Sequence, residues 1–408
     1  MAVVDRPTRV VVTGLGVLTP IGSTLEGFWD AAVRGDVGTL PLTRPDAADF
    51  PGRLAGEVRD VAAPRGTGDR VTRLAVTAAS AAVADAGLDP FPSDPARSGV
   101  CFGTLLGNRA GLEPDVTRFH RGTAPAGAGP RAARPRPVVG LADAVARQHG
   151  FLGPSTVVAT ACASGNSALA HGAEAIRAGR ADVMIAGGAD ELSAGIMMMF
   201  ASLRSLTDDA LRPFDRNRSG LVVSEGAAAL VLESYEHARR RGARVYAELA
   251  GWASACDAHH MTAPHPDGRG ARRSMERALA LAGTPLDRVG YISAHGTGTP
   301  SNDSVEAAAV RALFGERGPA VSSLKGALGH TQGAASAIEA VACVLALRDG
   351  VVPPTANLVE PDPECAVDLV HGAAREAALD VVVNNAFGFG GNTACTVFTR
   401  PGTGRSTA

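Results

Sequence analysis

One cysteine of this 408-residue chain stands where a nucleophile would be useful. Cys162 follows the β-branched run STVVAT at residues 155–160 and precedes an Ala-rich helical pattern at residues 165–178. We therefore expect Cys162 at a strand-to-helix turn, where the positive end of the helix dipole favours thiolate and lowers the thiol pKa. A buried cysteine acting as a small apolar filler is the ordinary alternative. The turn context and the small flanking residues favour a nucleophile.

Two histidines occupy comparable turns. His295 ends the apolar run at residues 289–294 and precedes the letters GTGT, while His330 lies five residues after Lys325 and ahead of a helix that carries Glu339. A satisfied loop histidine or a phosphate-binding turn is the alternative for His295, but the pattern Gly-x-x-x-x-Gly-Lys-Ser/Thr is absent. The alternative for His330 is a histidine at a helix start beside a surface lysine. Both histidines strengthen the interpretation of Cys162 as a nucleophile.

A glycine-rich segment near the end of the chain, NNAFGFGGNTA, contains Phe389 between Gly388 and Gly390. Glycines allow backbone N–H groups to approach a ligand closely, and a hairpin turn is the plain alternative.

Two other patterns point away from metal and nucleotide binding. The segment with Cys256, Asp257, His259, His260 and His265 has the residue types of a metal site, but its spacing fits no common one. We prefer a loop of the substrate channel there and predict no metal site. The opening letters TGLGVLTPIG lack the third glycine of a dinucleotide fingerprint, so we interpret them as a tight turn.

Short apolar runs alternate with helical patterns along the whole chain, which predicts an α/β fold with buried, largely parallel sheets. The second half shows the same alternation of short apolar runs and helical patterns as the first, and no linker separates the two. We therefore expect a layered fold of two pseudo-duplicated halves, residues 1–240 with the cysteine and residues 241–408 with the two histidines. Residues 104–137 lack periodicity and are expected to form a surface excursion, and residues 400–408 a disordered tail.

Composition excludes several classes of protein. The chain is 45% hydrophobic and 20% charged with a net charge of −2, which gives no general signature for nucleic acid or membrane binding. The start has no apolar signal-peptide core, and no run approaches the roughly 20 apolar residues of a membrane span. Six scattered cysteines without a CxxC pair suit neither a disulfide framework nor a zinc site. We expect a cytoplasmic protein with reduced thiols.

The order and context of these segments together resemble the β-ketoacyl-acyl-carrier-protein synthases over nearly the whole chain. The landmarks that carry the resemblance are VVVTGLGVLTPIG, GPSTVVATACASG, IAGGAD, RPFDRNRSGLVVSEGAAALVLE, DAHHMTAPHPDG, AHGTGTPSND, LKGALGHTQGAASAIE and FGFGGNTACTVF. The resemblance implies a thiolase-like α-β-α-β-α fold, a dimer and a Cys–His–His active site. The activity it implies is a decarboxylative Claisen condensation of a Cys-bound acyl chain with malonyl-carrier protein.

Roles carry over from this resemblance position by position. Cys162 would accept the acyl group, and His295 and His330 would hold the extender thioester and promote its decarboxylation, since neutral imidazoles can donate N–H to a developing enolate. Lys325 and Glu339 would orient His330. The backbone N–H groups of Cys162 and Phe389 would form the oxyanion hole, with the Phe389 ring as a gate. The loop after His295 would be braced by Asp303 and Glu306.

The resemblance also implies partners. We expect no tightly bound cofactor, because the phosphopantetheine arm of an acyl-carrier protein would present the substrate. Such a carrier is acidic, so docking requires a local basic patch, for which we propose Arg70, Arg73 and Arg204. The chain would form a homodimer, or a heterodimer with a chain-length-factor-like subunit.

Some segments depart from the family pattern. The stretch before RPFD is short, Ser219 and Ser224 replace an acidic residue and a glycine, and residues 131–139 (RAARPRPVV) replace an apolar, dimer-lining stretch. The short stretch is more similar to type II ketosynthases of polyketide and polyene pathways. Two alternatives stay open: a non-catalytic chain-length-factor-like subunit, which typically lacks the cysteine, and a coenzyme A-dependent enzyme of the same fold.

Overall fold

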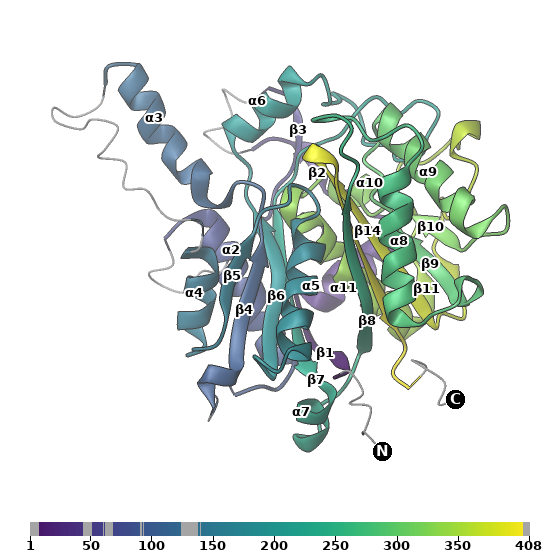
Figure 1. Ribbon diagram of the computed structural model, residues 1–408. Helices are drawn as coiled ribbons and strands as arrows, with labels where there is room; N and C mark the ends of the chain where they lie inside the picture. The colour runs from purple at the N-terminus through teal and green to yellow at the C-terminus, as the bar shows by residue number, and fades with distance from the viewer. Residues whose placement is uncertain are drawn as a thin grey trace.

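The computed structural model describes residues 8–43, 51–59, 61, 68–89, 92, 94–123, 138 and 140–402. As the sequence predicts, helices and strands alternate along the chain (Figure 1). The main strands are β1 (Val10–Leu18), β4 (Ser98–Gly103), β5 (Ser155–Val158), β6 (Val183–Asp190), β7 (Gly226–Ser234), β8 (Ala247–Cys256), β9 (Val289–Ser293), β10 (Ala320–Ser322), β12 (Asp368–Leu369), β14 (Val381–Gly388) and β15 (Asn392–Thr399). The helices are α1 (Leu25–Arg34), α2 (Arg70–Asp85), α3 (Glu113–His120), α4 (Gly140–Gln148), α5 (Ser164–Arg177), α6 (Ala194–Ser202), α7 (Tyr235–Arg240), α8 (Arg269–Ala282), α9 (Pro300–Phe314), α10 (Lys325–Leu328) and α11 (Ala335–Asp349).

The main strands form one sheet with a repeated internal order. Its sequence of neighbours is β12-β10-β9-β14-β15-β8-β1-β7-β6-β4-β5. In one half β5, β4 and β6 run parallel and β7 and β1 follow antiparallel; in the other, β10, β9 and β14 run parallel and β15 and β8 follow antiparallel. The halves meet where β1 pairs with β8. This matching order confirms the pseudo-duplicated fold, while the division at residue 240 stays a prediction.

Helices form three layers around the two halves of the sheet. The inner layer consists of α5 and α11, which contact each other and strands of both halves. Every side chain of α11 from Ala335 to Leu347 is buried, as expected for a helix that is apolar on all sides. The outer layers are α2 with α4 on one side and α8 with α9 on the other (Figure 1). The inner helices bring the two halves' functional turns to the centre of the molecule.

The opening segment differs from the prediction. The expected tight turn at Gly14 and Gly16 is wrong, because β1 continues through both glycines to Leu18. A Cβ atom at Gly14 would lie 2.2 Å from the carbonyl oxygen of Ala82, and one at Gly16 would lie 2.0 Å from that of Ala78. The glycines therefore let the backbone of α2 pack directly on the strand.

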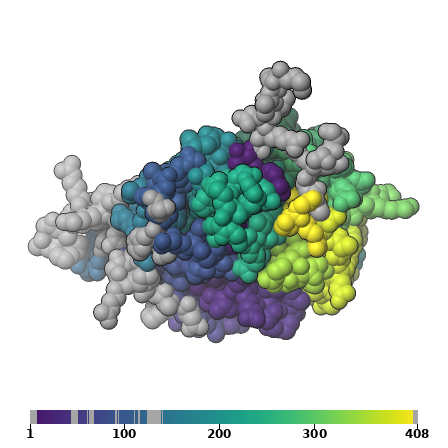
Figure 2. All heavy atoms as spheres, turned by 90° about the horizontal axis from the view of Figure 1, so that it is seen from below, coloured from purple at the N-terminus to yellow at the C-terminus, as the bar shows by residue number. Residues whose placement is uncertain are grey.

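The predicted surface excursion is partly described. After β4 the chain forms α3, which projects away from the body of the molecule with Val116 and Phe119 exposed (Figure 1). Residues 131–139, apart from Val138, and the end of the tail lie outside the described residues. The described chain begins and ends on one lower face, where β1 starts and β15 stops (Figure 2). No helix within the described ranges is long and apolar enough to cross a membrane.

Candidate active site

The turn that carries Cys162 joins β5 to the inner helix α5. Ala161 adopts a left-handed backbone conformation with φ of 53°, which is unfavourable for a residue with a Cβ atom. The hydroxyl of Ser164 holds this turn by accepting from the backbone N–H of Thr160 at 2.9 Å and donating to the carbonyl of Ala161 at 2.5 Å. The result places Cys162 one residue before the helix cap, at the positive end of the α5 dipole.

The ionisation of Cys162 differs from the expectation. The thiol is only 5% exposed, and burial raises its pKa to about 12, with Lys325 acting in the opposite direction. The predicted lowering of the pKa is therefore wrong for the resting protein, because desolvation of the thiolate is the largest influence on this pKa and raises it. A protonated thiol needs a base to accept its proton when it attacks a carbonyl.

His295 lies on a loop held by two buried carboxylates of α9. Glu306 accepts from the backbone N–H groups of His295 and Gly296, both at 2.8 Å, and Asp303 accepts from those of Thr297 and Gly298 at 3.0 and 3.1 Å. Both carboxylates thus lie where the sequence places them, bracing this loop. Burial and nearby Lys325 lower the pKa of His295 well below 6.5, so the imidazole is neutral.

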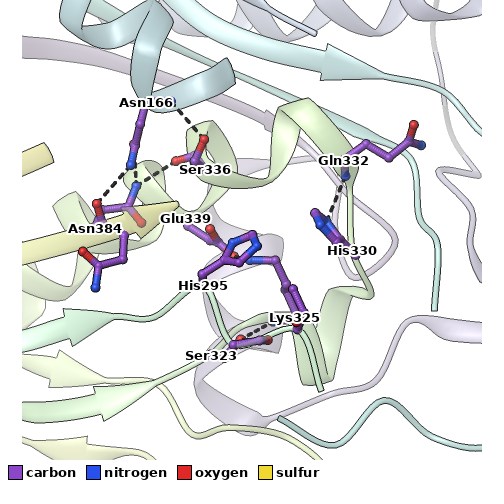
Figure 3. A network of polar contacts seen from close by, with 12 residues as sticks. Asn166, His295, Ser323, Lys325, His330, Gln332, Ser336, Glu339 and Asn384 are labelled. Atoms are coloured by element: carbon purple, nitrogen blue, oxygen red, sulfur yellow. Dashed lines mark hydrogen bonds and ion pairs between the residues drawn. The ribbon is translucent and has the colours of Figure 1, made fainter. Parts of the chain in front are cut away.

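His330 lies between β10 and α11, as Cys162 lies between β5 and α5 in the other half. Its Nδ1 accepts from the backbone N–H of Gln332 at 3.1 Å, which leaves Nε2 to carry the proton of the neutral ring (Figure 3). Burial and Lys325 lower its pKa well below 6.5. The rings of His295 and His330 meet edge to face with centroids 5.6 Å apart.

Lys325 and Glu339 form a buried ion pair beside the histidines. The Lys325 Nζ lies 2.5 Å from the Glu339 Oε1, and both side chains are at most 1% exposed, so Lys325 is not a surface lysine (Figure 3). Burial raises the pKa of Glu339 to about 7, and the lysine opposes this. The hydrogen bond to the His330 ring comes from the Gln332 backbone, and the charge of Lys325 acts on both imidazoles.

A single cavity joins the three candidate groups. It measures about 260 Å³, and its inner lining includes Cys162, His295 and His330. Phe387, Gly388 and Phe389, from the hairpin that joins β14 to β15, also line this cavity. The segment FGFGG is therefore both a hairpin turn and part of the site.

Gly388, next to Phe389, permits close approach of the two candidate oxyanion donors. A Cβ atom at Gly388 would lie 2.9 Å from the carbonyl oxygen of Thr160 and 3.1 Å from the backbone N of Cys162. A larger residue would push the hairpin from the cysteine turn. The structure thus brings the backbone before Phe389 against that of Cys162.

Some residues of the site were missed by the sequence reasoning. Asn166, in the first turn of α5, accepts from the Asn384 amide at 2.9 Å and donates to the Asn384 carbonyl at 3.0 Å (Figure 3). Ser336 of α11 accepts from the Asn166 backbone N–H at 2.9 Å. This buried network connects α5, which follows Cys162, to β14 and to α11. Pairs of asparagines 218 residues apart give no signal in one sequence.

Phe200 was also missed. Its ring lies 6.3 Å from that of His330 and 5.8 Å from that of Phe389, measured between centroids, and it lines the cavity. It comes from α6, a helix that the sequence reasoning did not identify.

The three predicted docking arginines have different surroundings. Arg70 donates to the buried Glu225 carboxylate and to the Val58 carbonyl, so its charge is paired within the protein, and its docking role stays a prediction. Arg73 is half-buried and donates to the Gly68 carbonyl at 3.1 Å. Arg204 is exposed, between the cavity-lining residues Leu203 and Ser205. Of these three arginines, Arg204 is the one that adjoins residues lining the cavity.

The segment from Cys256 to His265 forms part of the cavity wall. Asp257 lines the cavity and accepts from the backbone N–H groups of His265 and Gly270, both at 3.0 Å. Within the described ranges, no group of three or more His, Cys, Asp or Glu is arranged to hold a metal ion. All six cysteines of the chain lie in the described part and all are free; Cys256 is the exposed one.

Comparison with known proteins agrees with this geometry. Residues 7–238 match the family described as Beta-ketoacyl synthase, N-terminal domain, and residues 246–359 match its C-terminal domain. The ketoacyl synthase alpha subunit of the tetracenomycin polyketide synthase of Streptomyces glaucescens is 41% identical over 423 residues, covering 98% of each chain. The 3-oxoacyl-(acyl-carrier-protein) synthase 2 of Synechocystis is 41% identical over 408 residues, covering 96% of this chain and 97% of the relative.

Solved structures show the same fold. The ishigamide ketosynthase/chain length factor superposes with a TM-score of 0.92 at 37% identity, over 97% of this chain and all of the matched chain. A type II polyketide ketosynthase in complex with its acyl-carrier protein, AntDE:AntF, superposes with a TM-score of 0.89 at 34% identity over the same shares. Together, these matches and the shared cavity show that the chain belongs to the β-ketoacyl synthase family of condensing acyltransferases.

Proposed function

We propose that Cys162 carries the growing acyl chain as a thioester and that His295 and His330 activate the extender unit, in a type II polyketide or polyene pathway. The observation that carries this proposal is the common cavity: three turns far apart in the sequence bring one thiol and two neutral imidazoles to the same space.

The first step is acyl transfer. The Cys162 sulfur attacks the carbonyl carbon of an acyl thioester, and a neutral histidine of the cavity accepts the thiol proton. The negative oxygen of the tetrahedral intermediate accepts from the backbone N–H groups of Cys162 and Phe389. The intermediate collapses, the carrier's thiolate leaves and is reprotonated, and the acyl group stays on Cys162.

The second step is decarboxylation and condensation. A malonyl thioester loses carbon dioxide, and the electron pair of the broken bond forms an enolate whose oxygen accepts N–H bonds from the two imidazoles. The enolate carbon attacks the Cys162 thioester, a carbon–carbon bond forms, and the cysteine sulfur leaves. Neutral imidazoles suit this role, because their N–H groups donate without the charge that burial disfavours.

Partners follow from the chemistry and from the relatives. We propose an acyl-carrier protein whose phosphopantetheine arm enters the cavity, without a tightly bound cofactor, and a cytoplasmic location. We also propose a dimer, with a second copy or with a chain-length-factor-like subunit. Two features support a dimer: β5 is an edge strand with its first residues exposed, and Val116, Val138 and Met198 near it are exposed apolar side chains.

The pathway is proposed from similarity. The tetracenomycin and ishigamide proteins, which resemble this chain over nearly its whole length, are named for polyketide and ketosynthase systems. The short stretch before residues 212–215 (RPFD) includes the end of α6 and the turn at Arg204. Its residues Phe200, Leu203 and Ser205 line the cavity.

Intact-mass measurement after incubation with acyl-carrier proteins of several chain lengths tests the function. We expect a mass increase equal to the acyl group, located on the Cys162 peptide and lost in Cys162→Ala. Since Cys256 is exposed, both proteins carry Cys256→Ser in this experiment. Absence of acylation with every carrier would favour the non-catalytic, chain-length-factor-like alternative.

A further inference from the structure

A row of arginines runs along the outer face of α8. Arg269, Arg273 and Arg277 follow one another at intervals of four residues, and all three are exposed. Residues four apart on a helix lie on one side of it, about 6 Å from one another along the axis. We call these three residues the α8 row.

The charge of the α8 row is not neutralised within the described part of the chain. No carboxylate there forms an ion pair with any of its three members; Arg269 donates to the backbone carbonyl of Asp257 at 2.9 Å. The one acidic residue of the helix, Glu276, lies 3.4 Å from Arg272. The helix has four arginines and one glutamate, so it presents a net positive face to solvent.

The N-terminal end of the row lies at the cavity. Gly268 precedes Arg269 directly and Ala271 follows it by two residues. Both line the same cavity as Cys162. Arg204 also adjoins this cavity, because its neighbours Leu203 and Ser205 line it. The α8 row therefore begins beside the space that a carrier's prosthetic arm must reach.

We propose that the α8 row, together with Arg204, forms the docking surface for the acidic face of the acyl-carrier protein. The proposal rests on the function proposed above, because it assumes that the substrate arrives on a carrier. Positive charges at the rim of an interface steer an acidic partner and raise its association rate, an effect that salt weakens. Such charges act on carrier-bound substrate only.

The test compares two double charge reversals that change the net charge equally. Arg273→Glu/Arg277→Glu alters the row but keeps the Arg269 bond to the cavity wall. Arg180→Glu/Arg240→Glu is the matched control, because both residues are exposed and lie after the far end of α5 and on α7, away from the cavity. Each protein is assayed with an acyl-carrier protein substrate and with a small acyl thioester that needs no docking, at low and at high salt.

We expect the row variant to raise KM for the carrier substrate about tenfold at low salt, with kcat unchanged, and the difference to shrink at high salt. Activity with the small thioester stays at the parental level. The neutral pair Arg273→Gln/Arg277→Gln gives a smaller rise in the same direction.

Two results would overturn the proposal. One is a KM for the carrier that rises no more in the row variant than in the control. The other is an equal loss with both substrates, which would mean that the arginines support the fold or the cavity. Either result with an active parental protein leaves the proposed function standing, whereas a parental protein that never accepts an acyl group would refute that function instead.

Discussion

The turns that carry Cys162 and His330 occupy equivalent places in the two halves, yet they are built differently. Each follows a corresponding parallel strand of its half, β5 or β10, and precedes an inner helix, α5 or α11. The cysteine turn depends on backbone geometry: a left-handed Ala161 and the hydroxyl of Ser164. The histidine turn is preceded by the short α10 helix and is supported by the buried Lys325–Glu339 pair.

The difference fits the two contributions that the proposed mechanism assigns to the halves. A covalent nucleophile needs an exact position and room for the substrate, which small residues and a strained turn provide. Groups that stabilise a developing enolate need a fixed electrostatic environment, which buried charges and oriented N–H groups provide. The same topology therefore supports two different tasks, and changes in the two turns should have separable effects.

The largest separation is expected from Cys162→Ala. Without the sulfur no acyl-enzyme forms, so condensation should fall by about 10³-fold or more. The histidines do not need the sulfur for decarboxylation, and release of carbon dioxide from malonyl-carrier protein should continue. Equal loss of both activities would show that the two turns do not act independently. The assays are product mass for condensation and carbon dioxide release for decarboxylation.

The reciprocal change is His295→Ala or His330→Ala. Removing one N–H donor to the enolate should lower decarboxylation by about 10²- to 10³-fold. Acylation of Cys162, read by intact mass, should persist in part. Both variants decarboxylating at the parental rate would contradict the roles given to the histidines.

Stability should next separate the buried ion pair that supports the histidine turn from an exposed ion pair of the same half. Glu339→Gln leaves the Lys325 ammonium buried without its partner, which should lower the free energy of unfolding by about 3–5 kcal/mol. Asp368→Asn removes the partner of Arg375 in an exposed ion pair and should cost about 0–1 kcal/mol. Urea denaturation of the two variants and the parental protein measures both values. Similar losses would mean that the buried pair has no special structural role.

The smallest effect is expected from pH. Because burial holds the pKa of both histidines well below 6.5, imidazole titration should not change the decarboxylation rate between about pH 8 and about pH 6. Unfolded histidines take up protons near pH 6.5 and the folded ones do not, so stability should fall as pH drops below that value. A tenfold loss of rate per pH unit below pH 7 that persists in Glu339→Gln would show that an imidazole titrates in this range, because burial raises the pKa of the Glu339 carboxyl to about 7 and this variant removes that carboxyl.

The sequence was informative about local structure. The runs at residues 155–160 and 289–294 predicted β5 and β9 within a few residues, and the helical patterns at residues 165–178 and around Glu339 predicted α5 and α11. It missed β8, whose residues Ala247–Cys256 lack a clear β-branched pattern. It also ended β1 too early, because glycines that signal turns in isolation here allow a helix to approach.

By itself, the sequence determined which residues had the types, neighbours and family landmarks for condensation chemistry: Cys162, His295 and His330 were named from their turns. Only the tertiary structure decided what surrounds them. The pKa of Cys162 depends on burial by segments far away in the chain, the partner of Arg70 is the buried Glu225, and Asn166 meets Asn384 across two elements. These properties arise from contacts between distant residues, and local patterns in one sequence carry no information about such contacts.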